Sequence, residues 1–250
     1  CAIPLMRGKH VSKPMEQLVN EAKALVRDGI KEIMLIAQDS TFYGIDLYGE
    51  RKLAELMDRL SDVEGLDWIR LHYAYPSKFP FDVLPIINSK PNICKYLDIP
   101  IQHISDNVLK SMRRGITKRR TEEVLDRIRS EVDKIALRTT LLVGHPGEYD
   151  QDFEELKDFV NRYQFNRLGV FTYSHEDGTH AGTLEDHVSQ EIKSARADEI
   201  MGIQHDISFA HNQKLIGSTQ KVIIDRIEGD SYIGRTQFDS PEVDNEVIIS

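Results

Sequence analysis

The residues best suited to chemistry in this sequence follow short apolar runs that recur along the chain. Amide, carboxylate, imidazole and phenol side chains come directly after four of these runs: Gln38 and Asp39, His72 and Tyr73, Gln102 and His103, and His175 and Glu176. Such side chains donate and accept hydrogen bonds on several sides. They suit a polar, zwitterionic ligand better than an apolar one.

A second chemical feature is the thiol of Cys1, because cysteine binds metals and acts as a nucleophile. The alternative is an inert thiol, and composition does not separate the two. Cys94 is the only other cysteine, and with no cysteine near it in sequence it is interpreted as structural. Two distant cysteines exclude a disulfide framework and suit a reducing compartment, so a cytoplasmic location is predicted.

The elements that position these residues alternate between strand and helix. Apolar runs predict strands at 32–39, 68–75, 95–101, 137–144 and 167–174, and amphipathic segments predict helices between them. This alternation indicates an α/β fold with a parallel sheet covered by helices, as in a complete or partial (β/α) TIM-like barrel. The site of such a barrel lies at the carboxyl ends of its strands. No strand precedes the loop at 1–13, so a partial barrel without its first strand is expected.

The pattern changes after residue 188. A long helix is predicted up to Gly217, followed by β-strands with a hairpin turn at Gly229 and Asp230. We therefore expect one domain at 1–216 and the beginning of a small OB-like β-barrel at 217–250.

Composition excludes some classes of protein. The chain has 250 residues, of which 40% are apolar, and its formal net charge is −9. No run approaches the roughly 20 apolar residues of a membrane span, and the start has no secretory signal pattern. The acidic balance argues weakly against a general nucleic-acid binder, although a local basic patch can outweigh a total.

Several long motifs in a fixed order carry a resemblance to a known family. The stretches "CAIPLMRGKHVSKP", "LIAQDSTFYGIDLYG", "IPIQHISDNVLKSMRRG", "RTTLLVGHPGE" and "FTYSHEDGT" resemble the radical S-adenosylmethionine methylthiotransferases, and residues 223–249 resemble their TRAM domain. The match is closest to the RimO type, which modifies a ribosomal protein. The tRNA-modifying MiaB type is the alternative, and it typically has Gly-Gln-Asn where this chain has Ala37, Gln38 and Asp39.

The resemblance implies a specific chemistry. Cys1 matches the third cysteine of a Cys-x-x-x-Cys-x-x-Cys motif that binds a [4Fe-4S] cluster, and S-adenosylmethionine would bind its fourth iron. The radical formed there would lead to a methylthio group on the β-carbon of an aspartate in small-subunit ribosomal protein twelve. A second cluster is expected in the full-length protein. Because two motif cysteines are not in this sequence, the chain is predicted to be an inactive fragment without a stable cluster.

The resemblance also implies roles for particular residues. Gln38 and Asp39 would bind the amino group of the cofactor, and Gln102 would lie beside it. On the next strand Arg138 would hold the cofactor carboxylate, Thr140 would belong to the same binding face, and Gly144 would let the backbone approach the adenine. The alternatives are plainer: Gln38 and Asp39 could cap the helix that follows, and Arg138 could pair with a protein carboxylate.

Two charged segments suggest partners. The acidic residues of 217–250, Asp239, Glu242 and Asp244 among them, predict a surface that binds the basic ribosomal protein. The run "KSMRRGITKRR" at 110–120 has six basic residues and no acidic one. Either these residues complement the end of a helix, or they form a contact with ribosomal RNA.

Two other classes of function stay open at this stage. A metal-dependent barrel hydrolase would use histidines near strand ends, namely His72, His103, His145 and His175. A binding module without catalysis is the other class.

Overall fold

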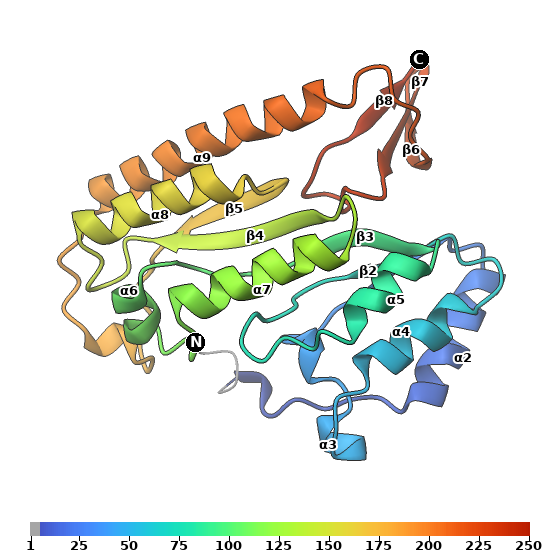
Figure 1. Cartoon of the computed structure of the whole chain (residues 1–250), viewed down its shortest axis with the longest axis horizontal. Helices are drawn as coiled ribbons and strands as arrows, with labels where there is room; N and C mark the ends of the chain where they lie inside the picture. Colours follow the sequence, from blue (N-terminus) through green and yellow to red (C-terminus); the bar gives the residue numbers. More distant parts are fainter. Residues whose placement is uncertain (1–5) are drawn as a thin grey trace.

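A parallel five-stranded sheet forms the centre of the protein, seen in a computed structural model that describes residues 6–250 (Figure 1). The strands lie side by side in chain order, and each pair of neighbours is parallel. They are β1 (Glu32–Leu35), β2 (Trp68–Leu71), β3 (Ile93–Asp98), β4 (Ala136–Val143) and β5 (Arg167–Thr172). The predicted partial α/β barrel is confirmed. Each strand ends one to four residues before its predicted last residue.

Helices precede, connect and follow the strands in sequence, and they cover one face of the sheet. They are α2 (Met15–Arg27), α4 (Leu53–Ser61), α5 (Val83–Ser89), α6 (Asp106–Ser111), α7 (Lys118–Glu131), α8 (Asp150–Tyr163) and α9 (Gln190–Gln213). Three shorter elements, which the sequence did not predict, are η1 (Ser40–Phe42), α3 (Ile45–Tyr48) and η2 (Ala181–Thr183). Within 6–250 no helix has the length and apolar character that a membrane crossing requires.

The two faces of the sheet carry different side chains, because successive residues of a strand point to opposite faces. Ile69, Leu97 and Leu137 point toward the helices and are completely buried in the main apolar core. Arg70 and Arg138 point to the other face, since each is the neighbour of one of these core residues. This second face is therefore rich in charge, and charged groups removed from water need partners.

The C-terminal β-strands supply those partners. β6 (Val222–Glu228), β7 (Ser231–Thr236) and β8 (Val247–Ile249) form an antiparallel sheet, and Gly229 with Asp230 makes the predicted hairpin turn. Figure 1 shows this sheet beside the end of the large sheet at which β4 begins. Arg167 at the start of β5 donates from Nε to Asp239 Oδ1 over 3.0 Å. Tyr96 donates its hydroxyl hydrogen to Asp244 Oδ2 over 2.8 Å.

These contacts correct the prediction that the acidic residues of 217–250 form a docking surface. Asp239 is only 4% exposed, and the side chain of Asp244 is 2% exposed. Both carboxylates face arginines of the large sheet, since Asp244 also lies 3.5 Å from Nε of Arg138. Of the three acidic residues, Glu242 alone remains exposed. The composition gives the number of these charges but not their location, and the fold buries two of them.

Removing the arginine from the Arg167–Asp239 pair should destabilise the protein. Arg167→Gln leaves the Asp239 carboxylate buried without a cation, which typically costs about 3–5 kcal/mol. The free energy of unfolding in urea measures the change. Arg226→Gln is the control, because Arg226 of β6 pairs with Glu228 and Glu246 in an exposed position and should have little effect. Equal losses in the two variants would contradict this account of the interface.

Candidate functional site

The predicted site residues gather at the carboxyl edge of the parallel sheet. Gln38 and Asp39 follow β1, Gln102 follows β3, and Thr140 lies within β4. Thr140 shares a face with Arg138, because both alternate with buried residues along the strand. This is the face opposite the helices, so it is the side on which a ligand can approach these residues.

Gln102 is fixed beside Thr140 by its backbone. Its N–H donates to the carbonyl oxygen of Thr140 over 2.9 Å, and its own carbonyl accepts the N–H of Leu142 over 2.7 Å. Its φ of 70° lies in the left-handed region, which is strained for a residue other than glycine and is common at functional sites. Within 6–250 the side chains of Gln102 and Thr140 make no hydrogen bond, so both are free to bind a ligand.

Asp39 serves the fold as well as the candidate site. One carboxylate oxygen, Oδ1, accepts the N–H of Thr41 over 3.0 Å and its hydroxyl hydrogen over 2.6 Å, which caps η1. The plainer alternative, that Asp39 caps the next helix, therefore holds for this oxygen. The other oxygen, Oδ2, accepts no hydrogen bond from the described residues. Gln38 beside it is exposed.

Tyr73, one of the residues that the sequence places directly after a strand, belongs to this edge. Its φ is 54°, and its side chain is 44% exposed. Its N–H donates to Asp98 Oδ2 over 3.3 Å, and its carbonyl accepts the N–H of Ser40 over 3.0 Å. The strained backbone is thus held from both sides while the ring stays accessible.

Arg138 lies farther from the carboxyl edge, at the third position of β4. Its Nη1 donates to Asp98 Oδ1 over 3.1 Å, and its Nε lies 3.5 Å from Asp244. The plainer alternative, a pairing with protein carboxylates, is what the structure contains. The role of Arg138 as a ligand of a cofactor carboxylate stays a prediction, and these contacts weigh against it.

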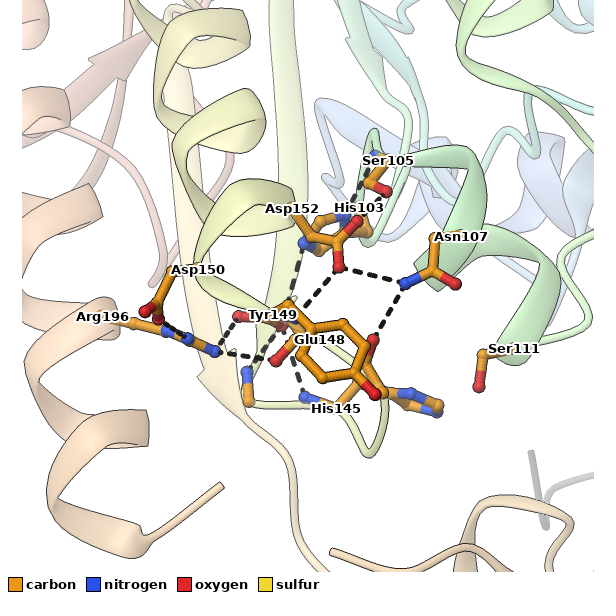
Figure 2. A network of polar contacts seen from close by, with 12 residues as sticks. His103, Ser105, Asn107, Ser111, His145, Glu148, Tyr149, Asp150, Asp152 and Arg196 are labelled. Carbon is orange, nitrogen blue, oxygen red and sulfur yellow. Dashed lines mark hydrogen bonds and ion pairs between the residues drawn. The ribbon is translucent and has the colours of Figure 1, made fainter. Parts of the chain in front are cut away.

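Glu148 organises the loop after β4, as Figure 2 shows. Its side chain is completely buried, and Oε2 accepts the N–H of Gly144 over 2.7 Å. Arg196 of α9 donates to Oε1 over 2.8 Å. Burial raises the pKa of Glu148, while the Arg196 guanidinium opposes this rise. Sequence reasoning missed Glu148, although it ends the quoted stretch "LVGHPGE".

Gly144 has a structural requirement for glycine. Its φ is 73°, and a Cβ there would lie 2.3 Å from Cγ of Lys193 on α9. Any larger residue would push α9 away from the loop. This requirement accounts for the glycine independently of the predicted approach to an adenine, which no contact tests.

Histidines near the strand ends were the candidates for a metal site. Among residues 6–250 no group of three or more histidine, cysteine, aspartate or glutamate side chains is arranged to hold a metal ion. His103 is completely buried, its Nδ1 accepts the N–H of Ser105 over 3.0 Å, and burial lowers its pKa to about 3. Burial also lowers the pKa of His145. The structure therefore gives no support to a metal-dependent hydrolase. Cys1, the predicted cluster ligand, lies outside the described residues.

Comparison with protein families agrees with this geometry. The model of the Radical SAM superfamily matches residues 1–160. The chain belongs to the radical SAM superfamily. A TRAM domain model matches residues 216–250, which contain the antiparallel sheet.

Curated relatives are similar to this radical SAM chain along its whole length. "Ribosomal protein uS12 methylthiotransferase RimO" of Flavobacterium johnsoniae is 57% identical over 249 residues, which are 100% of this chain and 57% of the relative. A protein of the same name from Porphyromonas gingivalis is 56% identical over 250 residues, with 58% of its length covered. The chain thus spans somewhat more than half the length of the curated relatives it matches.

Two solved radical SAM structures are similar in fold alone. Coproporphyrinogen III oxidase from Escherichia coli superposes with a TM-score of 0.59 at 14% identity, over 89% of this chain and 60% of that one. The radical S-adenosylmethionine methyltransferase TsrM of Kitasatospora setae, with cobalamin and a [4Fe-4S] cluster bound, has a TM-score of 0.54 at 17% identity, over 68% of this chain and 33% of that one.

The neutral, buried His103 should make the protein less stable in acid. The unfolded histidine titrates near pH 6.5 and the folded one near 3, so below pH 6.5 only the unfolded chain gains a proton. Stability is lost as the pH falls, by about 2 kcal/mol between pH 6.5 and pH 5 for one such group. His103→Asn keeps an acceptor for Ser105 and should remove this contribution.

Urea unfolding of wild type and His103→Asn at pH 7 and pH 5 measures this contribution. His205→Asn is the control, because the side chain of His205 is 82% exposed and should leave the pH dependence unchanged. If wild type and His103→Asn lose equal stability between the two pH values, His103 is not the group responsible.

Proposed function

We propose that this chain is part of a radical SAM methylthiotransferase that acts on ribosomal protein uS12. The observation that carries this proposal is 57% identity along the whole chain to relatives named as RimO. Because the chain covers less than two thirds of those relatives, the activity is proposed for the complete product of the gene that encodes it. The reaction would place a methylthio group on the β-carbon of an aspartate, in the cytoplasm, where ribosomes work.

We also propose the domain division expected from the sequence, with residues 1–216 as the radical SAM part and 217–250 as the first part of a TRAM domain. The end of α9 at Gln213 and the start of β6 at Val222 support a boundary between them. The TRAM model begins at residue 216, close to the predicted division.

The free polar groups at the carboxyl edge fit S-adenosylmethionine. Four residues have hydrogen-bonding capacity that the described residues do not use: Gln38, Gln102, Thr140 and, through its Oδ2, Asp39. On the same face Met34 is 45% exposed and Phe171 65% exposed. Polar groups suit the amino-acid part of this cofactor, and apolar side chains suit its adenosine. When bound at a reduced cluster, S-adenosylmethionine supplies a carbon radical that removes hydrogen from an unactivated carbon.

The cluster ligand is proposed from the resemblance alone. Cys1 would bind one iron of a [4Fe-4S] cluster through its thiolate, as is usual for such clusters. Cys94 does not suit this role: it is 1% exposed at the second face of the sheet, and burial raises its pKa to about 12. A buried thiol that stays protonated binds metal poorly.

The residues around the site give it a defined shape before any ligand binds. Glu148 fixes the amide of Gly144, and Arg196 ties this carboxylate to α9. Asp98 fixes the amide of Tyr73 at the end of β2. A site held in this way needs little rearrangement when it binds a ligand, so reactive groups stay positioned and side reactions of a radical are limited.

Cysteine substitutions in the complete gene product test the proposal. After anaerobic reconstitution with iron and sulfide, Cys1→Ala should lose iron bound at the radical SAM cluster and all transfer of a methylthio group to uS12. Cys94→Ala is the matched control and should keep both. Iron content and the mass of uS12 are measured separately. Methylthio transfer to tRNA in place of uS12 would support the MiaB-type alternative, and an active Cys1→Ala enzyme would refute the assignment of Cys1.

Gln102→Ala in the same protein should weaken binding of S-adenosylmethionine. A hydrogen bond to a charged ligand contributes about 1.5–3 kcal/mol, which is roughly a tenfold to hundredfold change in affinity. Titration calorimetry on the reconstituted protein measures it. Gln164→Ala is the control, because Gln164 also has a positive φ, of 45°, but ends α8 away from the edge. Unchanged affinity in Gln102→Ala would exclude contact with the cofactor.

A further inference from the structure

We infer that the loop between α6 and α7 binds the phosphate backbone of double-helical RNA beside the candidate site. The loop borders a surface cavity of about 750 Å³, here called the basic pocket, which is lined on its charged side by Lys110, Arg113, Arg120 and Asp106. The RNA is the expected neighbour of a ribosomal protein substrate, so this inference rests on the proposed function.

Only some of the basic residues at 110–120 are neutralised by the fold. Lys118 pairs with Glu155, and Arg119 and Arg120 share the single carboxylate of Glu123. Lys110 and Arg113 are exposed and make no ion pair within 6–250. The basic pocket therefore keeps positive charge although the chain as a whole is acidic.

Asp106 is the acidic residue of the basic pocket, and its charge is already engaged. Its Oδ1 accepts the backbone N–H of Lys118 over 2.6 Å, at the first turn of α7. The residue therefore stabilises the start of a helix, where a negative charge is favourable. It lowers the positive charge of the basic pocket without removing it, because Lys110 and Arg113 outnumber it.

Arg114 holds this loop in one conformation. It donates from Nη2 to the carbonyl of Pro100 over 2.6 Å and lies over the ring of Tyr75, 4.2 Å from its centroid. The Tyr75 hydroxyl donates in turn to the carbonyl of Arg114 over 3.0 Å. Arg113, with a φ of 56°, is thereby turned outward next to an anchored residue. A preformed loop loses little entropy on binding.

The basic pocket lies at the same rim as the candidate site. Asn107 of α6 donates to the carbonyl of Gly147 over 3.0 Å, and Ser111 donates to the carbonyl of Pro146. These carbonyls belong to the loop whose amides Glu148 fixes, and Figure 2 shows Asn107 beside that network. A partner that contacts Lys110 and Arg113 is therefore positioned at the entrance of the site.

The side chains at the basic pocket favour phosphates over bases. Single-stranded nucleic acid is usually bound by aromatic rings that stack on its bases. None of the described residues that line the basic pocket is aromatic, and the nearby ring of Tyr75 is covered by Arg114. Cations in a pocket without an aromatic lining contact the backbone of a duplex and carry no sequence preference. They would repel a basic protein, so the partner is RNA rather than uS12 itself.

Charge reversal tests the inference through the salt dependence of binding. The probe is a fluorescein-labelled RNA hairpin, and its anisotropy gives the affinity of the complete gene product between 50 and 200 mM KCl. Lys110→Glu with Arg113→Glu removes two phosphate contacts. The slope of log affinity against log salt should then fall by about 1.8, so wild type should lose about tenfold more affinity than the variant over this range.

Lys23→Glu with Arg27→Glu is the matched control. These two residues are exposed on α2 and make no ion pair in the described part of the chain, so the change in net charge is the same. The neutral variant Lys110→Gln with Arg113→Gln should show the same reduced slope as the reversal. A slope equal to that of wild type, or an equal loss in the control, would overturn the inference. Reconstitution with iron and sulfide and binding of S-adenosylmethionine are measured on the same variants. Both should be normal when RNA binding is lost, which keeps this test separate from that of the proposed function.

Discussion

The second face of the parallel sheet must bury charged side chains, and the rest of the structure depends on how it does so. Arg70 is completely buried beside Glu32, and Arg235 of β7 reaches the same carboxylate. Breaking such a pair leaves an uncompensated charge away from water, so each partner holds the other in place. The antiparallel sheet is therefore docked by specific ion pairs, and its Ile223 and the nearby Phe238 pack against an apolar cluster of the large sheet that includes Trp68.

Asp98 connects this interface to the candidate site. One of its oxygens accepts from Arg138, which also faces Asp244 of the C-terminal part, and the other accepts the amide of Tyr73 at the carboxyl edge. A single carboxylate, 2% exposed, thus serves both the docking of the β-sheet and the backbone of a site residue. A partner that displaced the β-sheet would alter the contacts of Arg138, and through Asp98 it would change the support of Tyr73.

Sequence reasoning succeeded where periodicity decides the outcome. The five strands and the larger helices follow from apolar spacing, and the carboxyl-edge site follows from the parallel order of the strands. It failed where long-range contacts decide: nothing local shows that Asp239 is buried against Arg167, that Gly144 makes room for Lys193, or that Glu148 caps the loop after β4. These contacts join segments far apart in the chain or depend on the exact path of a loop, and a pattern in one segment contains neither.

The location of charge, more than its total, decides which partners this chain can bind. A net charge of −9 suggests repulsion of nucleic acids. However, Asp98, Asp239 and Asp244 form ion pairs with arginines on the covered face of the sheet. Their field is cancelled at close range and contributes little at the surface. At the rim of the candidate site the balance is reversed, because Lys110 and Arg113 have no such partner among residues 6–250. The fold thus separates its charges, so that a chain acidic overall presents cations at the rim of the candidate site.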